Sequence, residues 1–318
     1  MKFSFLLSGE NVDLAILEVL SLAEAFGNLK GYDVDQRVLT IEFEGDSFFQ
    51  RIAFSHEAIE LLSICDFSEL ERIFSEIKVS QSFCVRVSGI GVKVDKDLEK
   101  KLGAILWKKG AKVNLRNPEE VVRVYVTPKR CYIGLLRFKQ EKKQFLMRRP
   151  NLRPFFMPIV TLPKLSRAIV NLASVKKGIV LDPMCGTGSF LIELGLLGLE
   201  FCGMDYYRDI VEGCKKNLKF MGLKANVLQG DARRMPFKSD SFDGVVTDFP
   251  YFKATRKAVG DDLYEKSLSE IERVLKKGKR AVIVTNLELE DFPMKLVAKI
   301  EQRVHGSLTR RIYVLQKI

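Results

Sequence analysis

Hydrophobic positions in the second half of the chain recur in two alternating patterns. Short apolar runs, typical of buried strands, lie at 178–184, 200–206, 225–231, 242–248 and 280–286. Segments with apolar residues at helical spacing lie between them, at 188–198, 208–222 and 263–278. Strands that alternate with helices indicate βαβ units, hence a mostly parallel sheet with helices on both faces. The last segment, 306–318, is predicted to be a strand that pairs antiparallel at the end of this sheet.

The first half of the chain has a mixed pattern. Segments with helical spacing lie at 11–27, 69–78 and 95–110. Strand-like runs lie at 37–45, 82–91 and 112–138, a mixture typical of small α+β modules. The joining segment, 139–158, combines prolines with Lys139, Lys142, Lys143, Arg148, Arg149 and Arg153. We interpret it as a basic interdomain linker, with a solvated loop as the alternative.

Composition narrows the class of protein. A chain of 318 residues, 47% of them hydrophobic, can form the cores of two or three domains. We expect no membrane span, because no apolar run approaches about 18 residues, and no secretory signal. Six cysteines without a CxxC pair favour a reduced, cytoplasmic protein with no metal site. The net charge of +12 is typical of a nucleic-acid partner or of solvated lysines.

The segment 180–191, VLDPMCGTGSFL, has the pattern strand, acidic turn, Gly-x-Gly, helix. Gly186 and Gly188 let a ligand approach the backbone where the helix begins. Leu191 stands where the dinucleotide-binding fingerprint has its third glycine. Asp182 would repel a pyrophosphate, whereas it would attract a cationic amino group. The pattern therefore favours S-adenosylmethionine over NAD.

Two further acids stand at predicted strand ends. Asp205 follows the second strand, where a carboxylate binds ribose hydroxyls, and Asp231 ends the third, where it can accept from the adenine amino group. Helix capping is the alternative role for each acid, but three acids at consecutive strand ends favour a ligand. We predict that the cofactor contacts Asp182, Pro183, Met184, Cys185, Gly186, Gly188, Ser189, Phe190, Asp205, Tyr206, Asp231 and Ala232.

Cys185, inside this loop, raises the question of a thiol nucleophile. The chain has two histidines, His56 and His305, and neither is near Cys185 in the sequence. A thiol without a partner that lowers its pKa is poorly activated. We interpret Cys185 as a small residue that packs under the cofactor.

The fourth predicted strand ends in TDFPY, residues 247–251. A base amine is a poor nucleophile because its lone pair is delocalised into the ring. The Asp248 carboxylate and the Phe249 carbonyl can accept its hydrogens, and Pro250 restricts Phe249 to extended geometry. Tyr251 offers a ring on which the base stacks. We predict that these four residues are catalytic, through position and electrostatics; a strand-to-loop turn with buried aromatics is the alternative.

This stretch resembles the fourth motif of amino-directed S-adenosylmethionine methyltransferases, in which Asp, Asn or Ser precedes two prolines and an aromatic residue. Phe249 replaces the first proline. Together with 155–173, 180–193 and 305–315, the motif is similar to the archaeal tRNA guanosine-10 N2-methyltransferase family, although that family often has histidine where Met157 stands. The resemblance implies an α/β fold, with a Rossmann-like class I methyltransferase domain preceded by α+β ferredoxin-like and THUMP modules.

The resemblance also implies domain boundaries and a substrate. We expect a ferredoxin-like domain at 1–52, a THUMP domain at 53–143, a linker at 144–164 and the methyltransferase domain, with a mostly parallel seven-stranded sheet, at 165–318. The implied reaction adds one or two methyl groups to the 2-amino group of guanosine 10 of tRNA, turned out of its stack. THUMP domains are associated with docking the tRNA acceptor end, and our candidate phosphate contacts are Arg86, Lys129, Arg130, Arg148, Arg149 and Arg153.

Other functions use the same motif. An amino-methyltransferase acting on other RNA, DNA adenine or protein glutamine is one alternative, and a non-catalytic tRNA-binding subunit is another. A ring-carbon methyltransferase is disfavoured because Tyr251 stands where its cysteine would be. We expect the third strand to form the sheet's edge, which invites pairing with another chain. The resemblance implies a small zinc-binding activator protein as the partner there.

Overall fold

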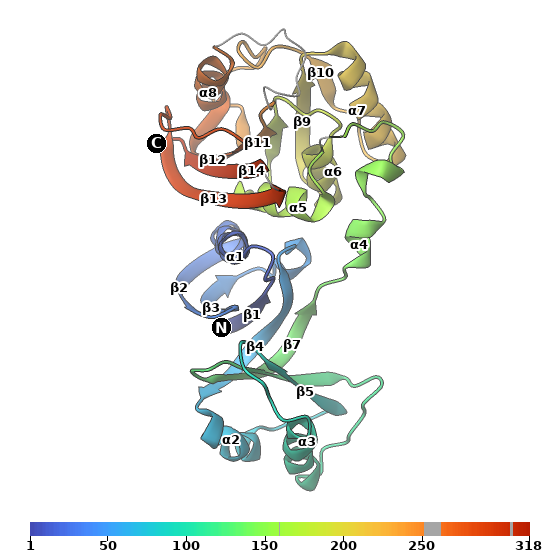
Figure 1. The fold of residues 1–318 in the computed structure, drawn as a ribbon, viewed down its shortest axis with the longest axis vertical. Coiled ribbons are helices and arrows are strands. Elements are labelled where there is room, and N and C mark those ends of the chain that lie inside the picture. Colours follow the sequence, from blue (N-terminus) through green and yellow to red (C-terminus); the bar gives the residue numbers. More distant parts are fainter. Residues whose placement is uncertain (159, 251–261, 306–307) are drawn as a thin grey trace. The chain divides into compact units, whose positions relative to one another are not determined.

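The computed structural model describes residues 1–158, 160–250, 262–305 and 308–318 (Figure 1). The chain forms two compact units: the first contains Met1–Ile16, Gly27–Gln50 and Phe54–Gln140, and the second contains Leu17–Phe26, Arg51–Ala53 and Glu141–Ile318. Within the described ranges, no helix is long and apolar enough to cross a membrane. The finer division expected at residues 52, 143 and 164 stays a prediction.

One seven-stranded sheet organises the first unit. In spatial order its strands are β2 (Gly27–Asp35), β3 (Val38–Gly45), β1 (Lys2–Leu7), β4 (Ser55–Cys65), β7 (Cys131–Lys139), β6 (Glu120–Val126) and β5 (Phe83–Gly89). Neighbouring strands are antiparallel except for β5 and β6. The helical segments are α1 (Val12–Phe26), which continues into the second unit, η1 (Phe49–Arg51), η2 (Phe67–Glu69), α2 (Leu70–Glu76) and α3 (Leu98–Lys108).

The sequence pattern missed three strands of this unit, β1, β2 and β4. Most of β2 is exposed, so its residues carry no alternation of apolar and polar positions. In β4, Glu57 and Glu60 interrupt the apolar pattern because they pair across the sheet with Arg123 and Arg137, each pair at 2.6 Å. Cross-strand ion pairs of this kind support a sheet without leaving a hydrophobic signal.

The second unit is built on a seven-stranded, mostly parallel sheet, which confirms the predicted fold class. Its order is β10 (Val227–Gln229), β9 (Glu200–Asp205), β8 (Ile179–Asp182), β11 (Phe242–Asp248), β12 (Leu275–Thr285), β14 (Leu308–Gln316) and β13 (Lys295–His305). β14 pairs antiparallel with both of its neighbours. β10 lies at one edge, as predicted.

The prediction that the final strand forms the edge of the sheet is wrong. The final strand, β14, is next to the edge, and β13 is the edge strand. Among residues 295–304 of β13 only Ile300 is buried, so the strand has too little buried apolar surface for the pattern to detect. The helix predicted at 263–278 also ends earlier, and α8 spans Leu263–Val274. Leu275 is fully buried and begins β12, where it pairs with Phe242.

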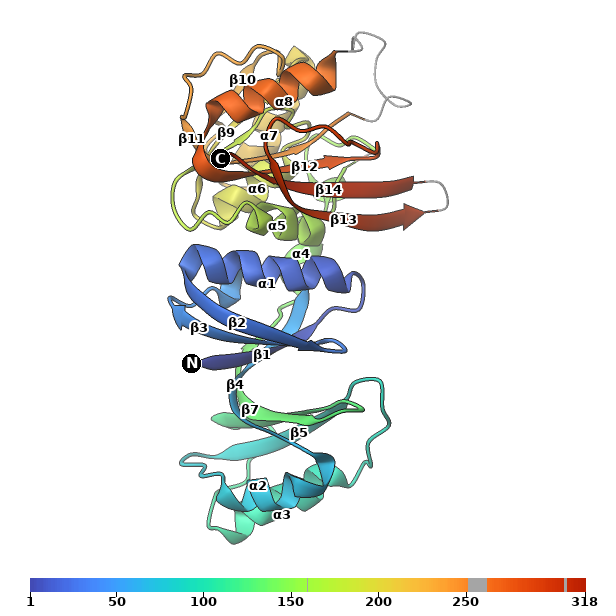
Figure 2. The same ribbon diagram turned by 90° about the vertical axis from the view of Figure 1, so that its left-hand side faces the viewer.

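Helices cover both faces of the second sheet. α8 lies over one face and α5 (Pro163–Leu172) over the other (Figure 2). The remaining helices are α4 (Lys143–Leu146), η3 (Pro150–Leu152), α6 (Ser189–Leu196) and α7 (Arg208–Phe220). On the α8 side, Leu181, Val245, Ile271 and Ile283 belong to one core cluster and are fully buried. Parallel strands covered on both faces place their carboxyl ends along one edge of the core, where ligands bind in such sheets.

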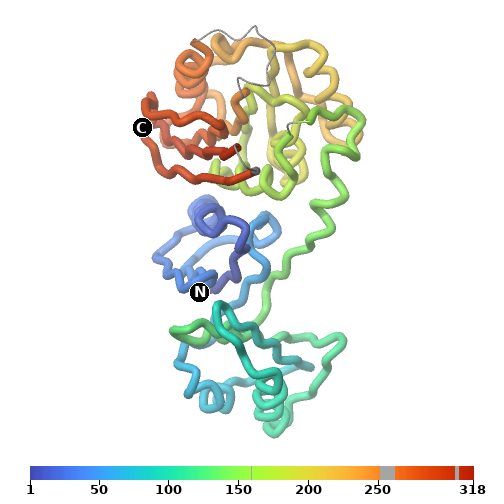
Figure 3. The backbone as a smooth tube through the Cα atoms, in the orientation of Figure 1, coloured from blue at the N-terminus to red at the C-terminus, as the bar shows by residue number. Residues whose placement is uncertain are grey.

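The segment 139–158 is more structured than the linker or solvated loop expected from its charges. It contains α4 and η3, and the tube winds accordingly in this part of the chain (Figure 3). From Glu141 onward the segment belongs to the second unit. Phe145 and Pro150 are buried. Buried apolar side chains therefore lie between its basic residues, and the charge of the segment alone does not predict that they are buried.

Candidate active site

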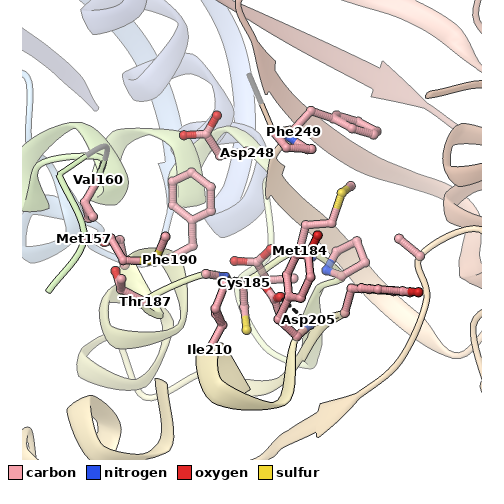
Figure 4. A pocket seen from close by; sticks show the side chains of 18 of the residues that line it. Met157, Val160, Met184, Cys185, Thr187, Phe190, Asp205, Ile210, Asp248 and Phe249 are labelled. Atoms are coloured by element: carbon pink, nitrogen blue, oxygen red, sulfur yellow. Dashed lines mark hydrogen bonds between the residues drawn. The ribbon is translucent and has the colours of Figure 1, made fainter. Parts of the chain in front are cut away.

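A cavity of about 390 Å³ lies at the carboxyl ends of β8, β9, β10 and β11 (Figure 4). It is lined by every residue that the sequence predicted as a cofactor contact except Gly188. Asp248, Phe249 and Pro250 line it as well, so the residues predicted for binding and for catalysis meet in one place. Tyr251 lies outside the described residues.

The glycine loop after β8 depends on two left-handed backbone positions. Gly186 has φ 50° and Gly188 has φ 87°, values that side-chain-bearing residues rarely adopt. A Cβ atom on Gly188 would lie 2.7 Å from the Cys214 Sγ atom. Gly188 is the N-cap of α6, and its amide donates to the Cys185 carbonyl at 2.8 Å. Gly188 therefore shapes the loop without lining the cavity.

Asp182 and Asp205 hold the loop and line the cavity with carboxyl groups. The Asp182 Oδ1 atom accepts from the Met184 amide at 3.3 Å. Asp205 accepts from the amides of Gly186 at 3.0 Å and Tyr207 at 3.2 Å. Burial raises the pKa of Asp182 well above its ordinary value and also raises the pKa of Asp205. A cation in this cavity would stabilise both ionised carboxylates.

Asp231 lines the cavity but has a partner that the sequence did not predict. Arg233 donates to both of its carboxylate oxygens, with a closest distance of 2.7 Å. These bonds lower the pKa of Asp231. Arg233 also reaches Asp262 at 3.2 Å. The Arg233 amide also donates to the Asp231 Oδ1 atom at 2.9 Å, so both oxygens of this carboxylate are engaged by Arg233.

Asp248 and Phe249 project to opposite sides of the end of β11 (Figure 4). The Asp248 Oδ2 atom accepts from the Thr161 hydroxyl at 3.0 Å. Phe249 is 1% exposed, and its ring stacks on Tyr264 with centroids 4.7 Å apart. The Phe249 amide donates to the Val284 carbonyl at 2.8 Å. The Phe249 side chain therefore belongs to the core, and the residue also lines the cavity.

The thiol of Cys185 is buried, and its Sγ atom lies 3.9 Å from that of Cys214. The hydrogen bond with Cys214 and burial raise the pKa of Cys185 well above the ordinary thiol value. A thiol in that state is a poor nucleophile, which supports its interpretation as a packing residue.

Sequence reasoning missed one wall of the cavity. Met157, Pro158, Val160 and Thr161, which precede α5, line it together with Thr187, Tyr207, Ile210, Gly230, Arg233 and Leu263. The first four lie in a segment that contains proline and has no periodic pattern of apolar residues. The sequence therefore gives no signal that they line the cavity. One of them is Met157, which stands where the family that the sequence resembles often has histidine.

The structure corrects two of the predicted phosphate contacts. Arg148 is 7% exposed and donates to both carboxylate oxygens of Glu193, at 2.6 and 2.9 Å. Arg153 is 6% exposed and donates to the Ser189 hydroxyl at 3.1 Å. Both guanidinium groups are thus engaged inside the second unit, so the prediction that they bind RNA is wrong. The neighbouring Arg149 is exposed.

The other basic candidates lie in the first unit. Lys129 is exposed, and Arg130 pairs with Asp33 at 2.9 Å. Arg86 lines a groove of about 340 Å³ together with Arg116, Arg123 and Lys139. Of these, Arg123 is paired with Glu57, whereas Arg116 and Lys139 have exposed side chains. The groove presents a positive surface on this sheet.

Comparison with known proteins places the chain in a family. Residues 150–312 match the family described as RMKL-like, methyltransferase domain. The chain is 34% identical over 325 residues to the tRNA (guanine(10)-N2)-dimethyltransferase of Pyrococcus abyssi, covering 96% of each chain. It is 32% identical to the Methanocaldococcus jannaschii enzyme of the same name, covering 99% of each.

A solved structure shares the fold at low sequence identity. The crystal structure of TrmN from Thermus thermophilus matches all of both chains, with a TM-score of 0.54 and 20% identity. The likeness supports the fold, and the sequence relatives identify the family. The cavity of acids beside the glycine loop, the motif that ends β11 and these relatives lead to one conclusion: the chain belongs to the tRNA (guanine(10)-N2)-dimethyltransferase family.

Proposed function

We propose that the protein transfers methyl groups from S-adenosylmethionine to the exocyclic 2-amino group of guanosine 10 in tRNA. The observation that carries this proposal is the position of Asp248, which lines the same cavity as Asp182 and Asp205. An acceptor for amine hydrogens therefore shares one cavity with the acids that suit a cationic donor. The relatives in Pyrococcus and Methanocaldococcus bear the name of this reaction.

The cavity suits S-adenosylmethionine in size and charge. Its volume of about 390 Å³ is within the usual range for small-molecule sites. The buried carboxylates of Asp182 and Asp205 match a ligand that carries sulfonium and ammonium charges. Asp231 lines the same cavity, where an adenine amine would compete with Arg233 for its oxygens. When bound, this cofactor supplies an electrophilic methyl group.

The residues of the chain act on the base. Asp248 accepts hydrogen bonds from the guanine amine, directs its lone pair and takes the proton that the methylated amine releases. The Phe249 carbonyl is the second acceptor. The carbonyl is held in position by the hydrogen bond from the Phe249 amide to the Val284 carbonyl and by the packing of the Phe249 ring on Tyr264. A fixed carbonyl and carboxylate reduce the reorganisation needed during transfer.

Nucleoside mass spectrometry on two tRNA transcripts tests this function. One transcript has guanosine at position 10, and the other has inosine, which lacks only the 2-amino group. The protein, purified together with any partner that accompanies it and supplied with labelled S-adenosylmethionine, should modify the first transcript and not the second. Equal labelling of both, or labelling of DNA adenine or protein glutamine instead, would contradict the proposal.

The number of methyl groups is part of the same proposal. The relatives carry the name dimethyltransferase, and we infer that this chain adds a second methyl group after the first. A time course should show monomethylguanosine rising and then declining as dimethylguanosine accumulates. Monomethylguanosine that persists at long times with excess enzyme would limit the reaction to one methyl group.

We further propose a protein partner at the β10 edge, a small zinc-binding activator. β10 has three residues and ends the sheet, and exposed strand edges favour pairing with another chain. Co-purification from cells, followed by zinc analysis of the complex, tests this partner. Full activity of the isolated chain, with no co-purifying zinc protein, would count against it.

The tRNA surface that we propose includes Arg86, Arg116 and Lys139 of the groove in the first unit, together with Lys129 and Arg130. We retain the ferredoxin-like and THUMP assignments of residues 1–52 and 53–143 as part of this proposal. The proposed substrate and the six free cysteines support a cytoplasmic location. Imaging of the tagged protein in its own cells tests that location.

A further inference from the structure

The segment that precedes α5 is fastened to the methyltransferase domain at two places. We call residues 141–158 and 160–162 the strap. At the first place, Arg148 donates to Glu193, which is fully buried, and Arg153 donates to Ser189. Both acceptors lie on α6, the helix that begins at the glycine loop. The strap is thereby fixed to the helix that helps shape the cavity.

The second fastening uses the backbone of the strap. The amide of Phe155 donates to the Asn217 Oδ1 atom at 2.9 Å, and the Asn217 Nδ2 atom donates to the Phe155 carbonyl at 2.8 Å. Asn217 lies on α7 and is fully buried. Gly213, also on α7, gives the Phe155 ring its space, because a Cβ atom there would lie 2.3 Å from the ring. The strap therefore enters the cavity from a fixed point two residues before Met157.

Thr161 lies beyond this point and contacts the proposed catalytic carboxylate. Its side chain is buried, lines the cavity and donates to the Asp248 Oδ2 atom at 3.0 Å. Helix capping does not account for this residue, because the N-cap of α5 is Leu162 and no side chain caps it. The hydroxyl is thus directed at Asp248, which comes from a strand 87 positions away in the sequence.

We propose that Thr161 is a positioning residue that fixes the Asp248 carboxylate for methyl transfer. This proposal rests on the proposed function. By donating to one oxygen, the hydroxyl sets the rotation of the carboxylate and stabilises its ionised form, which accepts hydrogens from the base amine. A carboxylate has about four lone-pair sites, so this bond leaves acceptor capacity for the substrate. The buried fastenings of the strap hold the hydroxyl in place.

Steady-state kinetics of Thr161→Val and Thr161→Ser test this role. Valine keeps the shape and removes the donor, and we expect kcat to fall about 10- to 100-fold, the range for a hydrogen bond to a charged group. The KM values for cofactor and tRNA should change less than about threefold, and serine should restore most of kcat. The acidic limb of the kcat–pH profile should move to higher pH in the valine variant, because its carboxylate has lost a donor.

A second readout needs no activity. In crystal structures of the protein without cofactor, the Asp248 side chain should occupy one rotamer in the wild type and Thr161→Ser, and more than one in Thr161→Val. Thr40→Val is the matched control, because it also removes a buried threonine hydroxyl, one that lies 2.7 Å from the Ser4 hydroxyl in the first unit. Its kcat should stay at the wild-type value.

The outcomes separate this inference from the proposed function. Wild-type kcat and a single Asp248 rotamer in Thr161→Val would overturn the positioning role and leave the function intact. Equal loss of kcat in the serine and valine variants would also overturn it. Wild-type protein that does not methylate tRNA even together with its co-purifying partner would refute the function, and the rotamers of Asp248 would then still decide whether Thr161 positions this carboxylate.

Discussion

The Phe249 amide donates to the Val284 carbonyl at 2.8 Å, a bond that proline at this position could not form. In the motif that the chain resembles, proline restricts the backbone at this point. Here the extra hydrogen bond continues the pairing of β11 with β12, and the aromatic ring stacks on Tyr264. Tyr264 also donates to the Pro250 carbonyl at 3.1 Å. Packing and pairing thus replace the rigidity of a proline ring.

We predict that Phe249 contributes strongly to stability. Phe249→Ala should lower the free energy of unfolding by about 3–5 kcal/mol, because it leaves a cavity against Tyr264. Urea denaturation monitored by circular dichroism measures the change. Phe220→Ala is the control, since Phe220 is 60% exposed and its truncation should cost less than about 0.5 kcal/mol. Similar values for the two variants would contradict the packing role.

Asp182 should make stability depend on pH in a particular direction. Burial raises its pKa, so the folded protein binds a proton more tightly than the unfolded chain. Ionisation of Asp182 therefore costs stability, and this cost is complete above the folded-state pKa and absent below the unfolded value. Asp182→Asn should unfold at a higher temperature than the wild type at alkaline pH, and the gain should fade as the pH falls towards 3.8.

Thermal unfolding of the cofactor-free protein across pH measures this gain. Asp291→Asn, at an exposed carboxyl, is the control. The same Asp182→Asn variant should bind S-adenosylmethionine more weakly than the wild type, because it lacks the negative charge. A variant that loses stability at alkaline pH, or gains it only in acid, would contradict the expected sign.

At the scale of elements, α6 organises both the cofactor loop and the strap. Its N-terminus follows the glycine loop, and its Glu193 accepts from Arg148 and from Arg167 of α5. Glu193 and both arginines are buried. Removing one member of such a network leaves charges buried without compensation. Helix α6, helix α5 and the strap are therefore expected to unfold together.

We predict that Glu193→Ala lowers the free energy of unfolding by about 3–5 kcal/mol. Hydrogen exchange should show faster opening of α5 and of residues 143–152 in the same variant. Glu212→Ala, which breaks the exposed pair with Lys215, should leave the unfolding midpoint unchanged. A Glu193→Ala protein as stable as the wild type would show that the network is dispensable.

The elements also show what the sequence could and could not predict. The acids that end β8, β9 and β11 lie along one edge of the sheet because parallel strands align their carboxyl ends, so the strand pattern was enough to predict that they meet. Thr161 and Met157 line the same cavity but lie in an irregular segment, so no periodic pattern of apolar residues predicts their position. Arg148 and Arg153 were misassigned because a sequence shows charge but not burial. Edge strand β13 was missed because only Ile300 is buried among its residues 295–304.

For the molecule as a whole, the net charge of +12 and the basic groove in the first unit favour binding to a polyanion. Each phosphate contact releases counterions, so affinity falls as salt rises. The buried Arg148 and Arg153 of the strap contribute to the net charge, but they are bonded to Glu193 and Ser189 and are therefore not expected to bind RNA. The exposed cations of the groove, together with Lys129 and Arg130, should contribute to the salt dependence.

We predict that Arg116→Ala combined with Lys139→Ala weakens tRNA binding and lowers the slope of log affinity against log salt by about 2. Fluorescence anisotropy with labelled tRNA at several salt concentrations measures this slope. Lys30→Ala combined with Arg72→Ala is the control, because those cations pair with Glu44 and Glu69. An unchanged slope in the first variant, or an equal change in the control, would remove the groove from the binding surface.

The proposed function depends above all on Asp248 accepting from a guanine amine in the cavity that holds the methyl donor. The most direct measurement is the initial rate of methyl transfer to tRNA by Asp248→Ala, with cofactor binding measured by calorimetry on the same sample. We predict a rate about 10²–10⁴-fold below the wild type, with cofactor affinity changed only a few-fold. A rate within a few-fold of the wild type would contradict this role of Asp248.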